Sequence, residues 1–137
     1  MSIVIDASFA AAWFLPDEAS AVTDAVARRL TTERGLIPGL FWHEMRNLLV
    51  MAHRRQRLSE EILFLQLSKL ERFPLVDCGP GDASDVVRLA LGRRLSAYDA
   101  SYLALAMRER ASLATLHQRL ATAARAENVA LLGPLAV

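Results

Sequence analysis

The sequence predicts an α/β fold in which a mainly parallel sheet of about five short strands is covered by helices on both faces. Short, continuously apolar runs, which are typical of buried strands, alternate with longer stretches whose apolar residues recur at helical spacing. Of the 137 residues, 53% are hydrophobic and 23% are charged, a globular composition with enough apolar side chains for one core. We therefore expect residues 1–137 to form a single three-layer α/β/α domain.

Five apolar runs are the expected strands. They are residues 3–5, 36–38, 75–78, 113–116 and 129–132. Parallel strands end at one edge of their sheet, and the functional site of such a sheet lies beyond that edge. Asp6 follows the first run and His117 follows the fourth. The two residues are therefore expected at the same edge.

Seven stretches with apolar residues at helical spacing are the expected helices, and most have a recognisable start or stop signal. Pro16 closes the first, and the acidic pair Asp17 and Glu18 suits the N-terminus of the second. The expected helices cover residues 7–15, 17–30, 41–52, 59–70, 82–95, 96–110 and 118–126.

Composition also restricts the location and partners of the protein. No apolar run is long enough to span a bilayer, the first residues do not resemble a secretion signal, and the single cysteine, Cys78, has no partner for an internal disulfide. We expect a cytoplasmic protein. Fifteen of the sixteen basic residues are arginines, whose planar fork matches phosphate. They form either solvated helix faces or a basic rim around an acidic pocket.

Three acidic residues lie where folding alone gains little from them. Asp6 ends an apolar strand, Glu44 interrupts the apolar stripe of its helix, and Asp99 shares a helix face with apolar residues. Each also has a structural interpretation. Asp6 suits the N-cap of the next helix, Asp99 lies at capping-box spacing from Ser96, and Glu44 could pair with an arginine from another element.

A shared cation explains the three acids together. Carboxylates gathered in one pocket raise each other's pKa, and a divalent cation offsets that repulsion. Magnesium prefers carboxylate oxygens, makes a bound water easier to deprotonate and stabilises charge on a phosphoryl oxygen. This pattern therefore indicates hydrolysis of a phosphodiester.

The chain resembles a PIN-domain ribonuclease of the VapC toxin type along essentially its whole length. The segments that carry the resemblance are residues 3–8, 13–18, 41–47, 95–106, 113–121 and 129–132. The resemblance implies a PIN-like α/β/α sandwich. It implies an endoribonuclease that depends on Mg²⁺ or Mn²⁺ and whose products carry a 5′-phosphate and a 3′-hydroxyl. It also implies a homodimer and a small antitoxin protein that closes off the active site.

The resemblance further implies site residues. Asp6, Glu44 and Asp99 would be both the catalytic acids and the metal ligands, with Ser8 and Thr115 as supporting hydroxyls. The family's fourth acid normally follows the Leu-Ala-Thr-Leu stretch, where this chain has His117.

A neutral imidazole is a poorer ligand for magnesium than for manganese or zinc. Four interpretations of His117 follow. The protein is a one-metal enzyme in which His117 orients a water or a substrate phosphate, an enzyme with altered metal choice, or a weakened nuclease that mainly binds its antitoxin or RNA. In the fourth interpretation His117 is an ordinary helix-start residue. The substitution could also be engineered.

Two other enzyme classes fit less well. A haloacid-dehalogenase-like phosphatase needs a second Asp two residues after the first, where this chain has Ser8. A phosphoacceptor receiver domain needs a downstream lysine, and the only lysine, Lys69, lies inside an expected helix. The stronger alternative is a PIN-fold protein that acts as a partner-binding module.

Overall fold

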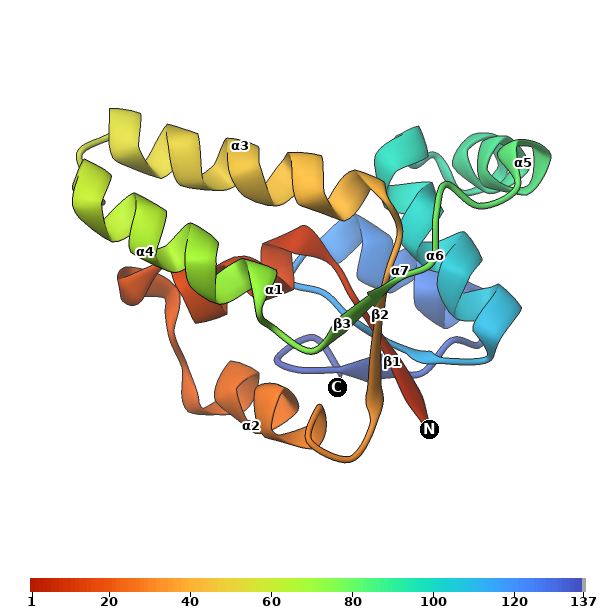
Figure 1. Cartoon of the computed structure of the whole chain (residues 1–137). Coiled ribbons are helices and arrows are strands. Elements are labelled where there is room, and N and C mark those ends of the chain that lie inside the picture. The colour runs from red at the N-terminus through yellow and green to blue at the C-terminus, as the bar shows by residue number, and fades with distance from the viewer. Residues whose placement is uncertain (137) are drawn as a thin grey trace.

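The structure is a computed structural model that describes residues 1–136. A five-stranded sheet in which all strands are parallel forms the centre of the protein (Figure 1). The strand order is β3-β2-β1-β4-β5. The strands are β1 (Ser2–Ile5), β2 (Arg34–Ile37), β3 (Leu75–Asp77), β4 (Ser112–Ala114) and β5 (Leu131–Leu132). The expected α/β class and parallel sheet are confirmed. Val137, the last residue of the expected single domain, lies outside the described residues.

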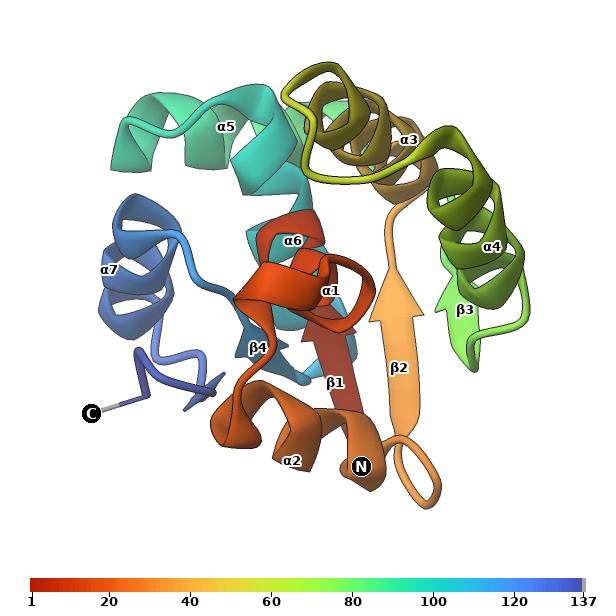
Figure 2. The same ribbon diagram turned by 90° about the vertical axis from the view of Figure 1, so that its left-hand side faces the viewer.

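Helices cover both faces of the sheet, in agreement with the expected three layers. The chain moves from β1 to β2 to β3 in one direction and then from β4 to β5 in the other, so right-handed crossovers place the two sets of helices on opposite faces. Helices α1 to α4 lie on one face and α5 and α6 on the other (Figures 1 and 2). The helices are α1 (Ala7–Phe14), the 3₁₀ helix η1 (Pro16–Glu18), α2 (Ala21–Arg29), α3 (Leu40–Arg54), α4 (Glu60–Glu71), α5 (Ala83–Arg93), α6 (Ala97–Glu109) and α7 (Gln118–Ala126).

The expected helix over residues 17–30 is wrong at its start. Pro16–Glu18 forms the separate turn η1, and α2 begins only after Ser20. The Ser20 hydroxyl accepts a hydrogen bond from the Thr23 backbone, and the Thr23 hydroxyl accepts one from the Ser20 backbone. This reciprocal capping box defines the helix start. Asp17 and Glu18 instead bind the guanidinium of Arg57, at 2.6 Å and 2.7 Å.

Three expected strands are shorter than their apolar runs, and the run over residues 75–78 loses only Cys78 from β3. The run over residues 113–116 gives β4 only as far as Ala114, because Thr115 and Leu116 turn their polar groups toward the end of β1. The run over residues 129–132 gives β5 at Leu131–Leu132, which pairs with Leu113 and Ala114. Residues 113–115 are buried, whereas the run over residues 129–132 is only partly buried and Ala130 is exposed, so an apolar run does not by itself fix which residues join the ladder.

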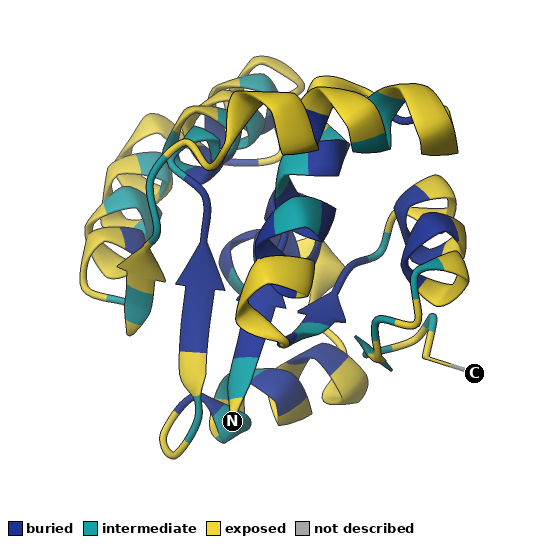
Figure 3. Cartoon of the chain, turned by 90° about the vertical axis from the view of Figure 1, so that its right-hand side faces the viewer, coloured by how far each residue is buried: buried dark blue, intermediate teal, exposed yellow. Residues whose placement is uncertain are grey.

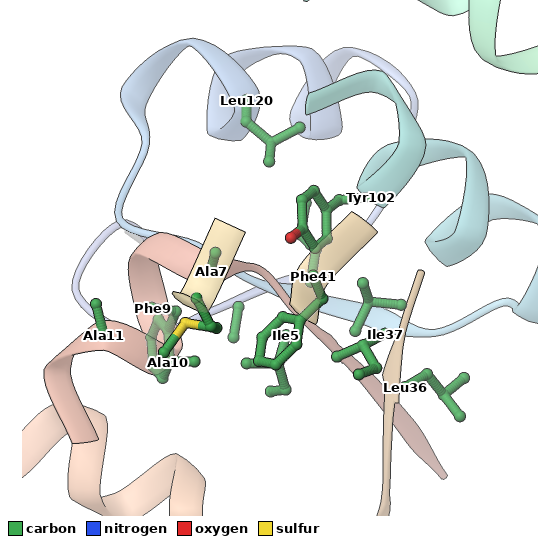
Figure 4. Packing of buried hydrophobic residues seen from close by; sticks show 14 of the residues in the cluster. Ile5, Ala7, Phe9, Ala10, Ala11, Leu36, Ile37, Phe41, Tyr102 and Leu120 are labelled. Atoms are coloured by element: carbon green, nitrogen blue, oxygen red, sulfur yellow. The ribbon is translucent and has the colours of Figure 1, made fainter. Parts of the chain in front are cut away.

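The core lies between the sheet and both helical layers. Figure 3 shows β1 and β2 buried over most of their length, whereas the outer faces of the helices are exposed. Figure 4 shows Tyr102 of α6 in this core near Ala7 and Phe41. Tyr102 is 1% exposed, so its hydroxyl needs a buried partner. No described helix has the length and apolar character needed to span a membrane.

The register of the two central strands sets the position of the next residues. Ile5 of β1 pairs with Ala114 of β4, and the Asp6 backbone N–H donates to the Ala114 carbonyl at 3.1 Å. Asp6 and Thr115 are the residues that follow this pair. Their side chains therefore meet at the carboxyl edge of the sheet.

Candidate active site

Asp6 is a buried carboxylate with three protein donors. One carboxylate oxygen accepts hydrogen bonds from the Ser8 hydroxyl at 2.7 Å and from the Phe9 backbone at 2.8 Å, so Asp6 is the N-cap of α1. The other oxygen accepts a hydrogen bond from the Thr115 hydroxyl. The N-cap interpretation of Asp6 is therefore confirmed. It also aims the carboxylate at the edge of the sheet, so capping is compatible with a site role.

Ser8 and Thr115 connect the ends of β1 and β4. The Ser8 hydroxyl accepts a hydrogen bond from the Leu116 backbone at 3.1 Å, and the Thr115 hydroxyl accepts one from the His117 backbone at 2.9 Å. Each hydroxyl thus accepts from the start of α7 and donates to Asp6. The two residues expected as supporting hydroxyls hold the buried carboxylate in place.

Burial dominates the acidity of Asp6. Removal of the carboxylate from water raises its pKa to about 6, although the hydrogen bonds from Thr115, Ser8 and Phe9 act in the opposite direction. The negative charge of Asp99 raises it further. Among residues 1–136 no ion pair gives the ionised Asp6 carboxylate a positive counter-charge.

Glu44 lies on α3 and lines the same pocket as Asp6. The Tyr102 hydroxyl donates to one Glu44 oxygen at 2.5 Å. Burial raises the pKa of Glu44, the Tyr102 hydrogen bond lowers it, and the charge of Asp99 raises it. Burial and the bond to Glu44 together raise the pKa of Tyr102, which keeps the phenol protonated as a donor. Among residues 1–136 no ion pair involves Glu44, so the arginine partner considered for it is not found.

Asp99 lies on the first turn of α6. Ser96 is the N-cap of this helix and accepts from the Asp99 backbone at 3.1 Å, but the Asp99 carboxylate does not complete a capping box. One oxygen instead lies 2.8 Å from Nδ1 of His117. The Asp99 side chain is 20% exposed and that of His117 is 51% exposed. His117 occupies the N-cap position of α7 without capping it, so its ring is directed to Asp99.

One pocket of about 260 Å³ joins these side chains. It is lined by Asp6, Ala7, Ser8, Glu44, Asn47, Leu48, Asp99, Tyr102 and His117. The structure therefore brings together all three predicted acids, Ser8 and His117, whereas Thr115 lies behind Asp6. Helices α1, α3 and α6 each contribute from a different part of the chain.

Two polar residues of the pocket were not predicted as site residues. Tyr102 follows Asp99 by three positions, and Asn47 follows Glu44 by three. Residues three apart share a helix face. That spacing is a signal that could have identified both, once the acids themselves were suspected.

The carboxylates fit a divalent cation by their chemistry. Three carboxylates line one pocket, and burial and mutual repulsion raise the pKa of two of them. A hard cation such as Mg²⁺ prefers oxygen ligands of this kind. Within residues 1–136, however, no group of three or more acidic, histidine or cysteine side chains converges on one metal position. Each carboxylate is held by protein donors instead.

An acidic pocket beyond the carboxyl ends of a parallel sheet is typical of α/β enzymes. Residues 3–126 match the model of the PIN domain family. The chain belongs to the PIN domain family, whose members are generally metal-dependent nucleases.

Solved structures share the fold over most of the chain. FitAcB from Neisseria gonorrhoeae aligns with a TM-score of 0.68 at 17% identity, covering 98% of this chain and 99% of that one. PAE2754 from Pyrobaculum aerophilum aligns with a TM-score of 0.66 at 24% identity, covering 90% of this chain and 79% of that one. VapC20 from Mycobacterium tuberculosis, a sarcin–ricin loop cleaving toxin, aligns with a TM-score of 0.61 at 14% identity, covering 88% of this chain and 94% of that one. A comparison with curated proteins found no match.

Proposed function

We propose that this PIN-domain protein is a metal-dependent endoribonuclease toxin that an antitoxin protein holds inactive. One observation carries the proposal. Asp6, Glu44 and Asp99 come from three elements and line a single pocket at the carboxyl edge of the sheet. The likeness to VapC20 supports RNA as the substrate class.

The three acids are proposed to hold Mg²⁺ or Mn²⁺. A bound divalent cation lowers the pKa of water and offsets charge on a phosphoryl oxygen. Ser8 and Thr115 fix Asp6, and Tyr102 fixes Glu44, so two of the ligands are oriented before a cation arrives. Such fixed orientation reduces the reorganisation needed when charge develops during the reaction.

The reaction proposed is hydrolysis of an RNA phosphodiester. The oxygen of a water forms a bond to phosphorus, the bond between phosphorus and O3′ breaks, and O3′ takes up a proton. The products are a 5′-phosphate and a 3′-hydroxyl. His117 lies half exposed beside Asp99, where its ring can orient a substrate phosphate.

Cleavage of RNA with Mg²⁺ or Mn²⁺ present tests the proposal. We expect the parent protein to cut RNA, and Asp6→Asn and Glu44→Gln to lose nearly all activity. Asp24→Asn is the matched control, because Asp24 is exposed on α2 at the other end of the molecule. A variant Asp6→Asn that is as active as the parent would overturn the assignment.

A specific observation favours a second candidate function. Where the VapC-type pattern has a fourth acid, His117 contacts Asp99 and occupies one of its oxygens. A PIN-fold protein with weakened or no nuclease activity would then act mainly by binding its antitoxin or RNA. Calorimetric titration with Mn²⁺ separates the two functions, because a binding-only domain without a metal site gives no heat.

The antitoxin, the homodimer and the cytoplasmic location belong to the same proposal. Apolar side chains exposed on α4, namely Ile62, Phe64 and Leu65, provide a surface that a protein partner could cover. Growth arrest on expression, relieved when a neighbouring small gene is co-expressed, tests the antitoxin. Light scattering of the purified protein tests the dimer.

A further inference from the structure

A basic hollow of about 520 Å³ lies between the end of α5 and one face of α7. Figure 2 shows these two helices on the same side of the molecule. Arg93, Arg94 and Arg119 line the hollow together with Gln118, and none of its described lining residues is acidic. In contrast, the pocket that holds Asp6 is lined by three carboxylates and no arginine. The two hollows therefore have opposite charge.

Two of the three arginines have no acidic partner in the part of the chain that the structure describes. Arg93 binds Glu127 at 3.0 Å. Arg94 and Arg119 are exposed, and within residues 1–136 neither forms an ion pair or a side-chain hydrogen bond. A guanidinium presents a planar fork of donors that matches the oxygens of a phosphate group. Two unpaired forks around one hollow are suited to a polyanion.

Residues that line the basic hollow lie close in sequence to residues that line the acidic pocket. Gln118 and Arg119 follow His117, whose ring contacts Asp99. Arg94 lies two residues before Ser96, the N-cap of the helix that carries Asp99. We therefore expect a chain of phosphates with one group at the carboxylates to run toward these arginines.

We infer that this hollow binds the sugar–phosphate backbone of RNA on one side of the cleaved bond, with Arg94 and Arg119 contacting phosphates. The inference rests on the proposed nuclease function and adds positioning residues to it. Contacts to phosphates set the register of a strand without reading its sequence. The hollow would therefore hold the strand while the pocket and other surfaces select the position that is cut.

Binding of a short fluorescent single-stranded RNA, followed by anisotropy over a range of KCl concentrations with Mg²⁺ present, tests the inference. Every protein in the series carries Glu44→Gln so that the RNA stays intact. The test variant adds Arg94→Gln and Arg119→Gln. Each lost phosphate contact on a single strand flattens the plot of log K against log salt by about 0.7. We expect a slope flatter by about 1.4 and a dissociation constant raised about 20-fold at roughly 0.1 M salt.

The matched control carries Arg28→Gln and Arg34→Gln, which remove the same charge at the opposite end of the molecule. Arg28 lies on α2 and Arg34 begins β2, and both residues are exposed. Figure 1 shows α2 at the end of the molecule opposite α3. We expect nearly unchanged binding and slope for this control. Circular dichroism confirms that all variants are folded.

Two results would overturn the inference. If the test variant binds RNA with the slope of its background protein, the hollow does not hold RNA and its arginines remain available to an acidic protein segment. If the control loses as much affinity as the test variant, the attraction is diffuse. Failure of the nuclease proposal is a separate result, since a parent protein that never cuts RNA with Mn²⁺ could still bind it through Arg94 and Arg119.

Discussion

Nδ1 of His117 lies 2.8 Å from a carboxylate oxygen of Asp99, and this contact connects the start of α7 to the first turn of α6. Asp99 in turn raises the pKa of both Asp6 and Glu44. His117, the residue that departs from the VapC-type pattern, therefore contacts the one acid whose charge acts on the other two.

Replacement of His117 by Asp should strengthen metal binding. The substitution adds a carboxylate to the pocket and frees the Asp99 oxygen that His117 occupies. We expect Mg²⁺ to bind roughly tenfold more tightly, a change of about 1.4 kcal/mol, as measured by titration calorimetry. His43→Asp is the control, since His43 is exposed on α3 and does not line the pocket. Equal affinity in His117→Asp and the parent would show that position 117 contributes nothing to the metal site.

Asp6→Asn should make the metal-free protein more stable at neutral pH. The pKa of Asp6 rises from 3.8 to about 6 on folding, so between these values the folded state binds more protons than the unfolded state. Asp6 therefore contributes favourably to the free energy of unfolding at low pH, and this contribution is lost as pH rises through 6. The difference amounts to about 3 kcal/mol.

Urea unfolding in EDTA measures this effect. We expect the stability advantage of Asp6→Asn over the parent to grow by about 3 kcal/mol between roughly pH 4 and pH 7.5. Asp24→Asn, on the exposed face of α2, should show no comparable growth. An advantage that does not change with pH would mean that burial of the Asp6 charge carries no penalty.

Tyr102→Phe should shift the pH dependence of RNA cleavage. The Tyr102 hydroxyl bonds the ionised form of Glu44 and lowers its pKa, so its loss raises that pKa. Glu44 would then ionise only at higher pH, and the acidic limb of the rate profile should move to higher pH. Tyr98→Phe, which changes an exposed tyrosine on the same helix, should leave the profile in place. A lower rate with an unshifted limb would speak against this role.

Thr115→Val should destabilise the fold. The Thr115 hydroxyl is buried, donates to Asp6 and accepts from the His117 backbone, so valine leaves both groups without this partner. We expect a loss of about 1–3 kcal/mol in the free energy of unfolding, measured in urea. Thr115→Ser should recover most of it, whereas Thr122→Val, on the exposed face of α7, should have little effect. If serine fails to rescue, the methyl group rather than the hydroxyl matters.

Much of the fold could be predicted because it depends on local patterns. Apolar runs located all five strands, and helix Gln118–Ala126 has the predicted bounds. The error at the start of the second helix occurs where two local signals compete. At Asp17 and Glu18 an acidic start signal lies next to the stronger capping box of Ser20, and the distant Arg57 binds both acids.

For the candidate site, the sequence by itself determined which carboxylates lack an obvious structural role and that Asp6 and His117 share a sheet edge. Strand order and parallel direction are enough for that conclusion. Only the tertiary structure decided the partners: Tyr102 for Glu44, Thr115 for Asp6 and His117 for Asp99. These contacts join residues far apart in the chain, and their geometry depends on how α3, α6 and α7 pack around the end of β1, which no local pattern specifies.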